Sequence, residues 1–217
     1  MIDKLVVGPL GVNTYFVIDK ETNSGFVIDP GAQAQDILDK IKRNKWEISM
    51  ILLTHGHYDH IGAAQALKEA LGCPIIAHKE GKLYLEDSAR NLSSVFGSEG
   101  VELKADQYIT EDDQESKELG KAFLATLGFK VLYAPGHTTD SIIFYFEHYK
   151  AAFVGDVIFK ESVGRTDLEG GSGPTLLEAI RTQVFTLPEE TALYPGHGPS
   201  TTVGYEKQHN PYFNGSF

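Results

Sequence analysis

One run of seven residues, Thr54-His55-Gly56-His57-Tyr58-Asp59-His60, constrains this chain more than any other feature. It directly follows an apolar, strand-like segment at 50–53, and a helical pattern at 63–71 comes after it. Imidazole and carboxylate groups are among the ligands that zinc prefers. The chain has 8 histidines, and three of them lie beside Asp59 in this one run. The run therefore predicts a metal-binding loop between a buried strand and a helix.

The rest of the chain alternates between short β-branched runs and segments with apolar residues three and four positions apart. Several of the expected strands follow one another directly, as in a meander. This pattern predicts an α/β fold with mixed β-pairing, in two sheets with helices outside. The expected strands are 2–7, 14–18, 25–28, 50–53, 74–77, 121–126, 130–133, 141–146, 151–154 and 192–194; the expected helices are 33–44, 63–71, 82–87 and 174–186; 93–100 and 110–118 are expected loops.

Length and composition limit the organisation of the chain and the partners that suit it. The 217 residues contain no Pro-rich or Gly/Ser-rich linker, so we expect a single domain, 1–217. Cys73 is the one cysteine, which fits a reducing compartment, and no basic segment leads into an apolar stretch at the N-terminus, so we expect a cytoplasmic protein. No apolar run approaches a membrane span of about 20 residues. The net charge of −11 is a poor match for nucleic acid or anionic lipid, so we expect neither as a partner.

Three further candidate ligands each follow an expected strand and a glycine. They are His137 in Ala134-Pro135-Gly136-His137, Asp156 in Val154-Gly155-Asp156, and His197 in Tyr194-Pro195-Gly196-His197. The histidine-rich loop can serve two neighbouring metal positions, but its four ligands cannot complete the coordination shells of two metals. These three residues are therefore the candidates for the remaining ligand positions. Isolated histidines are more often surface or hydrogen-bonded residues than ligands, which is our interpretation of His78, His148 and His209.

The His55–His60 run, with the later His137, Asp156 and His197, resembles the metallo-β-lactamase superfamily. The segments 153–156, 162–167 and 194–198 are similar to its short bacterial glyoxalase II-like (hydroxyacylglutathione hydrolase-like) branch. The resemblance extends from Asn13 to about Tyr212. It implies an αββα sandwich of two mixed β-sheets flanked by helices, with a dinuclear zinc site in a cleft at one edge.

The resemblance also implies a role for each candidate residue. One metal takes His55, His57 and His137, the other takes Asp59, His60 and His197, and Asp156 bridges the two. Two zinc ions are expected, with iron or manganese as alternatives in either position, and Asp59 and Asp156 are expected to be catalytic. Arg165 is expected to bind a substrate carboxylate, because guanidinium binds carboxylate through two parallel hydrogen bonds; the alternative is a structural salt bridge with Asp167.

We therefore expect a metal-dependent hydrolase in which a metal-bridging hydroxide attacks a small anionic thioester, of the hydroxyacyl-glutathione type or of another low-molecular-weight thiol. The first alternative is a persulfide dioxygenase with one iron held by His55, His137 and Asp156, because that branch also carries the Gly164–Asp167 signature. Three further alternatives remain: a lactonase or β-lactamase on the same fold, a nuclease, and a metal-stabilised binding or sensor protein. The acidic charge disfavours the nuclease. The sequence does not indicate an oligomeric state.

Overall fold

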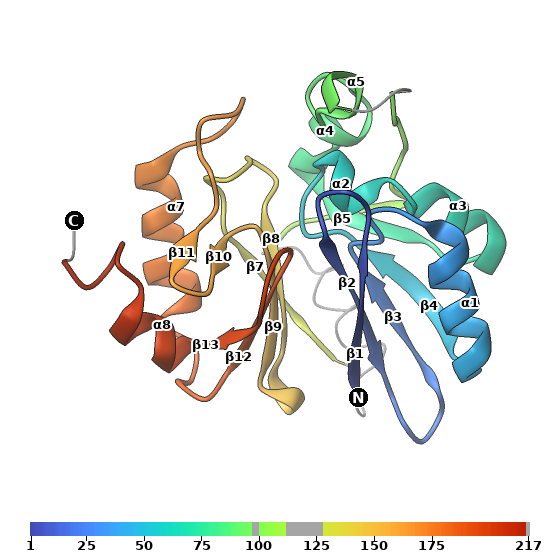
Figure 1. Cartoon of the computed structure of the whole chain (residues 1–217), viewed down its shortest axis with the longest axis horizontal. Helices are drawn as coiled ribbons and strands as arrows, with labels where there is room; N and C mark the ends of the chain where they lie inside the picture. The colour runs from blue at the N-terminus through green and yellow to red at the C-terminus, as the bar shows by residue number, and fades with distance from the viewer. Residues whose placement is uncertain (97–99, 112–127, 216–217) are drawn as a thin grey trace. The chain divides into compact units, whose positions relative to one another are not determined.

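The structure is a computed structural model that describes residues 1–96, 100–111 and 128–215 (Figure 1). Its backbone divides into two compact units, Met1–Ile109 and Thr110–Phe217. The expected strand at 121–126 and most of the expected loop at 110–118 lie outside the described residues.

The first unit is built on a six-stranded mixed sheet in which the strands follow one another in chain order. The first three strands pair antiparallel, and the remaining pairs are parallel. The strands are β1 (Ile2–Val7), β2 (Val12–Ile18), β3 (Ser24–Ile28), β4 (Glu47–Leu52), β5 (Ile75–His78) and β6 (Gln107–Ile109).

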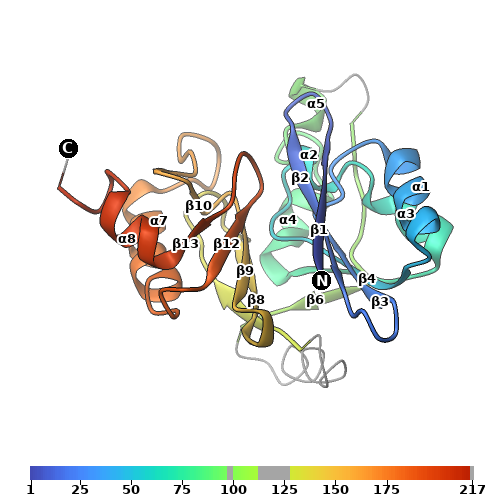
Figure 2. The same cartoon turned by 60° about the horizontal axis from the view of Figure 1, so that its bottom comes forward.

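Two helices, α1 (Ala34–Asn44) and α3 (Ala64–Leu71), lie side by side on one face of this sheet (Figures 1 and 2). Ile37 of α1 and Leu67 of α3 are fully buried in one apolar cluster with Phe16 and Ile51 of the strands. Burial of this apolar face, rather than helix propensity alone, stabilises such short helices. The shorter helices are α2 (Tyr58–Ile61), η1 (Lys79–Gly81), α4 (Lys82–Leu85) and α5 (Ser93–Phe96).

The second unit contains a five-stranded mixed sheet in the order β13-β12-β9-β8-β7 and a separate two-stranded hairpin. The sheet strands are β7 (Lys130–Tyr133), β8 (Ile142–Phe146), β9 (Ala151–Gly155), β12 (Ala192–Pro195) and β13 (Thr201–Thr202), and the hairpin is β10 (Ile158–Phe159) with β11 (Ser162–Val163). β9 and β12 are parallel, while β7, β8 and β9 are joined antiparallel.

Helices α7 (Gly173–Ala179) and α8 (Val203–His209) cover one face of this sheet (Figure 1). Leu176 of α7 and Val203 of α8 pack with Val154 and Leu193 of the strands in the second apolar cluster. The remaining helical turns are η2 (Glu147–Tyr149) and η3 (Ile180–Val184), a π-helical continuation of α7. The α/β class with mixed sheets is thus confirmed in both units.

Two details differ from the sequence-based expectation. The segment 93–100 is not simply a loop, because Ser93–Phe96 forms α5; the Asn91 side chain accepts a hydrogen bond from the Ser93 backbone N–H at 2.9 Å and supports this turn. The elements β6, β10, β11, β13 and α8 were not predicted, because two- or three-residue strands and a polar seven-residue helix carry too little apolar periodicity.

Candidate metal centre

In the first unit, the histidine-rich run forms the connection from β4 to α2. The His55, His57 and His60 side chains are all buried. The His55 ring centroid lies 4.1 Å from that of His60 and 4.9 Å from that of His57. Asp59 Oδ2 lies 3.8 Å from His60 Nε2. The loop therefore brings these four side chains close together.

A buried carboxylate that the sequence analysis did not single out, Asp29, holds this loop from the end of the neighbouring strand. β3 and β4 are parallel, so Asp29 and Thr54 leave the sheet at the same edge. Asp29 Oδ1 accepts a hydrogen bond from the Thr54 backbone N–H at 2.8 Å, and Oδ2 accepts one from the Thr54 hydroxyl at 2.6 Å. Asp29 Oδ2 also lies 2.9 Å from His60 Nδ1. The signal that could have revealed Asp29 is its position directly after an apolar strand, which Asp156 shares.

These contacts assign the protonated nitrogen of two imidazoles. An ionised carboxylate only accepts hydrogen bonds, so His60 carries its proton on Nδ1. The Thr54 hydroxyl donates to Asp29 and therefore accepts from His55 Nδ1, which is 3.2 Å away. Both histidines consequently present the unprotonated Nε2 that a metal ion requires.

The glycine at position 31 explains how closely the loops approach. A side chain at Gly31 would place its Cβ 1.6 Å from the backbone oxygen of Asp59, so only glycine fits there. The β3–α1 connection and the start of α2 are thus packed backbone against backbone.

In the second unit, the three predicted ligands follow strands that end at one edge of the sheet. His137 comes after β7, Asp156 after β9 and His197 after β12. Asp156 Oδ2 lies 3.7 Å from Nε2 of His137 and 3.7 Å from Nε2 of His197. One carboxylate oxygen is therefore within reach of two imidazoles, which is an arrangement suited to a bridging ligand.

The loop after the β10–β11 hairpin fixes His137. His137 Nδ1 donates to the backbone carbonyl of Arg165 at 2.8 Å, so Nε2 is its unprotonated nitrogen. Gly164 lies against Asp156, because a Cβ at position 164 would be 1.8 Å from the Asp156 backbone oxygen. The loop is thereby packed against two of the three ligands.

The Arg165 side chain pairs with Asp167, as one of the two sequence-based alternatives proposed. Its Nε and Nη2 donate to the two carboxylate oxygens, each at 2.8 Å. Both side chains are exposed, at 57% and 66%. The hydrogen bond from Arg165 lowers the pKa of Asp167 to about 2, and the same bond raises the pKa of Arg165. The pair uses two of the five guanidinium donors, so it does not by itself prevent a contact with substrate.

The donor set fits divalent metal ions of the zinc, iron or manganese type. It consists of neutral imidazoles and carboxylates, which suit these metals. Three of the imidazoles, those of His55, His60 and His137, have Nδ1 held by an acceptor of the protein. In known sites, a hydrogen bond from the imidazole nitrogen that does not bind the metal orients the histidine.

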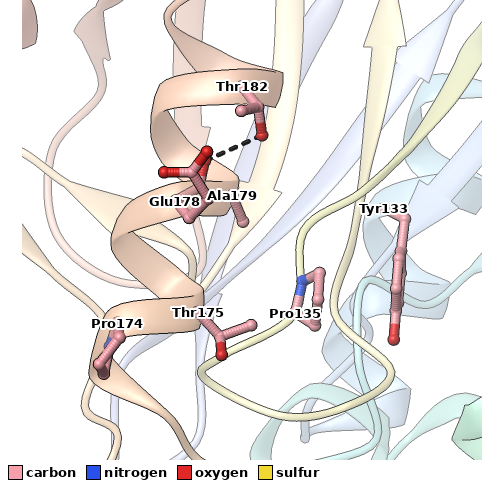
Figure 3. Close-up of a pocket in the computed structure, with 7 residues that line it drawn as sticks. All are labelled: Tyr133, Pro135, Pro174, Thr175, Glu178, Ala179 and Thr182. Carbon is pink, nitrogen blue, oxygen red and sulfur yellow. Dashed lines mark hydrogen bonds between the residues drawn. The ribbon is translucent and has the colours of Figure 1, made fainter.

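A pocket of about 480 Å³ lies between α7 and the end of β7 in the second unit (Figure 3). None of the predicted ligands or Arg165 lines it. Its lining residues are Tyr133, Pro135, Pro174, Thr175, Glu178, Ala179 and Thr182. No helix in the described part of the chain is long and apolar enough to cross a membrane.

Comparison with known proteins gives one consistent family. The family model of the metallo-beta-lactamase superfamily matches residues 7–197. The chain is 35% identical to the probable metallo-hydrolase YqgX of Bacillus subtilis, over 98% of this chain and 97% of that protein. It is 34% identical to the hydroxyacylglutathione hydrolase GloC of Haemophilus influenzae, over 93% of this chain and 92% of that protein.

Solved structures agree with this relationship. The crystal structure of the BLEG-1 B3 metallo-beta-lactamase matches with a TM-score of 0.89 and 35% identity, over 99% of this chain and 100% of that one. TTHA1623 in a di-iron-bound form matches with a TM-score of 0.82 and 32% identity, over 97% and 99%. ETHE1 from Myxococcus xanthus matches with a TM-score of 0.75 and 27% identity, over 99% and 85%.

Proposed function

The chain belongs to the metallo-beta-lactamase superfamily, and we propose that it is a dinuclear metal-dependent thioesterase acting on small anionic thioesters of the hydroxyacyl-glutathione type. The observation that carries this proposal is the position of one Asp156 oxygen 3.7 Å from Nε2 of both His137 and His197. A single carboxylate between two imidazoles is suited to sharing by two cations. The similarity to GloC supports the thioester as substrate.

We propose that both ligand sets serve one centre, as the family's ligand pattern implies. One metal would take His55, His57 and His137, the second would take Asp59, His60 and His197, and Asp156 would be shared. Bound divalent cations lower the pKa of a coordinated water toward about 7 and polarise a substrate carbonyl. We propose zinc, with iron or manganese as alternatives; the di-iron form of TTHA1623 makes iron a specific alternative to test.

The residues of the chain hold and orient this centre. Asp29 keeps the proton of His60 on Nδ1, and the Arg165 carbonyl does the same for His137. The carboxylates of Asp59 and Asp156 offset part of the positive charge of two close cations, so their catalytic role is electrostatic. No histidine or carboxylate has to act as a nucleophile in this scheme.

Arg165 is the proposed contact for a carboxylate of the substrate, remote from the reacting carbonyl. Its exposed side chain, held in one orientation by Asp167, presents the remaining guanidinium donors without a large loss of side-chain entropy on binding. The acidic chain otherwise repels an anionic substrate, so one oriented cation has a clear use.

A screen of two reactions tests the proposal. Purified protein is mixed with S-lactoylglutathione while thiol release is followed, and with glutathione persulfide while oxygen uptake is followed. The proposal expects thiol release that disappears in Asp156→Ala and persists in His148→Ala, an exposed histidine outside both ligand sets. Oxygen uptake with glutathione persulfide but no thiol release from S-lactoylglutathione, with one iron per chain, would favour the persulfide dioxygenase instead.

A further inference from the structure

The last helix of the described chain, α8, carries a carboxylate where it has no contact with solvent. Glu206 is 0% exposed, and so is Asn210, the residue that follows the helix end. A buried carboxylate is unfavourable unless hydrogen bonds replace its hydration. The hydrogen-bond partners of Glu206 therefore show which segments α8 fixes in place.

The Glu206 carboxylate accepts hydrogen bonds from three separate segments. Thr201 donates its hydroxyl to Oε1 at 2.5 Å. The Glu161 backbone N–H and Asn210 Nδ2 both donate to Oε2 at 2.9 Å. Asn210 Nδ2 also donates to the Ser162 backbone oxygen at 3.0 Å. Two of these contacts reach the β10–β11 hairpin, which is more than forty residues away in sequence.

The hairpin turn needs such support, because Glu161 adopts a left-handed backbone with φ 58°. This conformation is unfavourable for a residue other than glycine and persists when the surroundings enforce it. The Tyr205 hydroxyl donates to Glu161 Oε1 at 2.5 Å, and Lys160 Nζ lies 5.3 Å from the centre of the Tyr205 ring. Helix α8 thus contacts both residues of the turn, and Asn210 at its C-terminal end contacts Ser162 beyond the turn.

The hairpin and the loop directly after it lie against the three candidate ligands of the second unit. It begins two residues after Asp156, and the ring of Phe159 meets the ring of His197 at 6.4 Å between centroids. Beyond β11, Gly164 lies against the Asp156 backbone, and the Arg165 carbonyl accepts the hydrogen bond from His137 Nδ1.

We propose that Glu206 is a positioning residue for the metal centre: through the β10–β11 hairpin it sets the geometry of His137, Asp156 and His197 and the orientation of the Arg165 loop. This inference rests on the proposed metal-binding function. Glu206 contacts neither the candidate ligands nor Arg165, so its effect is transmitted by the hairpin backbone.

Two substitutions at Glu206 separate hydrogen bonding from charge. In Glu206→Gln, the amide oxygen can replace Oε2 as acceptor for Glu161 and Asn210, while the amide NH₂ donates to the Thr201 hydroxyl. Glu206→Met has a similar length but accepts no strong hydrogen bond. Glu189→Met is the matched control. Glu189 lies outside α8 and is an exposed carboxylate that pairs with Lys207, a residue of α8.

Two measurements report on the hairpin and on the metal site. In metal-free protein, amide hydrogen exchange of the peptide 157–166 is expected to accelerate about tenfold in Glu206→Met, because its local opening becomes easier. Zinc affinity, measured by chelator competition, is expected to fall about tenfold in the same variant. A loss of this size is typical when the hydrogen bonds that orient metal ligands are disturbed. Glu206→Gln and Glu189→Met are expected to stay within about threefold of the wild type in both.

Each outcome decides a different point. Wild-type exchange and zinc affinity in a folded Glu206→Met would overturn the inference, as would an equal loss in Glu206→Gln. If Glu206→Met does not fold, Tyr205→Phe replaces it: this variant removes only the hydroxyl that contacts Glu161, and unchanged exchange at 157–166 together with unchanged zinc affinity would overturn the inference. A wild type that binds no metal contradicts the proposed function instead, and hydrogen exchange still reports on the hairpin.

Discussion

Nδ1 of His60 lies 2.9 Å from Oδ2 of Asp29, a buried carboxylate at the end of the adjacent parallel strand. The same oxygen accepts the Thr54 hydroxyl, which in turn contacts His55 Nδ1. One carboxylate thereby fixes the proton positions of two imidazoles, directly for His60 and through a hydroxyl for His55.

Asp29→Asn should weaken metal binding by about 10- to 100-fold, the loss typical for partners of metal-ligating histidines. In either orientation, the amide NH₂ of asparagine would face an N–H group, that of the Thr54 backbone or that of His60. Chelator competition measures the affinity, and a thermal melt confirms folding. Asp39→Asn, an exposed carboxylate on α1, is the control; equal affinities in the two variants would remove Asp29 from the centre.

Arg165→Ala should raise KM for an anionic thioester about ten- to one-hundredfold and change kcat little, since a charge-assisted contact contributes about 1.5–3 kcal/mol. A contact remote from the reacting carbonyl stabilises ground and transition states alike. Kinetics with an anionic and a neutral thioester measure the effect. If both substrates lose equally and the melting temperature falls, Arg165 serves only to shape the loop with Asp167.

Asp167 gives a prediction for acid stability. Because Arg165 lowers the pKa of Asp167 from 3.8 to about 2, the pair stabilises the folded state fully above about pH 4. That contribution is lost as the pH falls through 2, where the folded-state carboxylate is protonated. The melting temperature of the wild type should therefore exceed that of Asp167→Asn slightly at pH 5, and the difference should shrink as the pH falls through about 2. A difference that stays constant across this range would contradict the assignment.

The rate of thioester hydrolysis should rise with pH and level off above an apparent pKa of about 6–8, because the nucleophile is generated by deprotonation of coordinated water. Alkylation of Cys73 should leave this profile unchanged. Cys73 is buried, and burial raises the pKa of its thiol, so it is a poor nucleophile at neutral pH. Inactivation in step with Cys73 modification would contradict a metal-based mechanism.

The sequence was informative where chemistry is concentrated in a few positions. Three histidines and Asp59 in one run predicted a ligand loop, and the structure brings these side chains together. Asp156 and His137 could be selected because each follows a strand and a glycine. Asp29 also follows an apolar strand, but a single aspartate before a proline is equally an ordinary turn signal, so this position alone was too weak to select it.

Glu206 could not be found from the sequence for a different reason. Its partners Thr201 and Asn210 are close in the chain, but the backbone of Glu161 lies 45 positions away, and only the fold brings them together. The β10–β11 hairpin has two residues per strand, which is too short for an alternating pattern. Roles that depend on long-range backbone contacts are therefore visible only in the structure.

The most direct test is a titration of metal-free protein with zinc while thiol release from S-lactoylglutathione is followed. If both ligand sets serve one dinuclear centre, the rate should increase with added metal and reach its plateau at two equivalents per chain. Asp156→Ala should show at least about a hundredfold lower plateau, in the range found when one electrostatic stabiliser of a reaction is removed. A plateau at one equivalent, or full activity without metal, would contradict the dinuclear hydrolase.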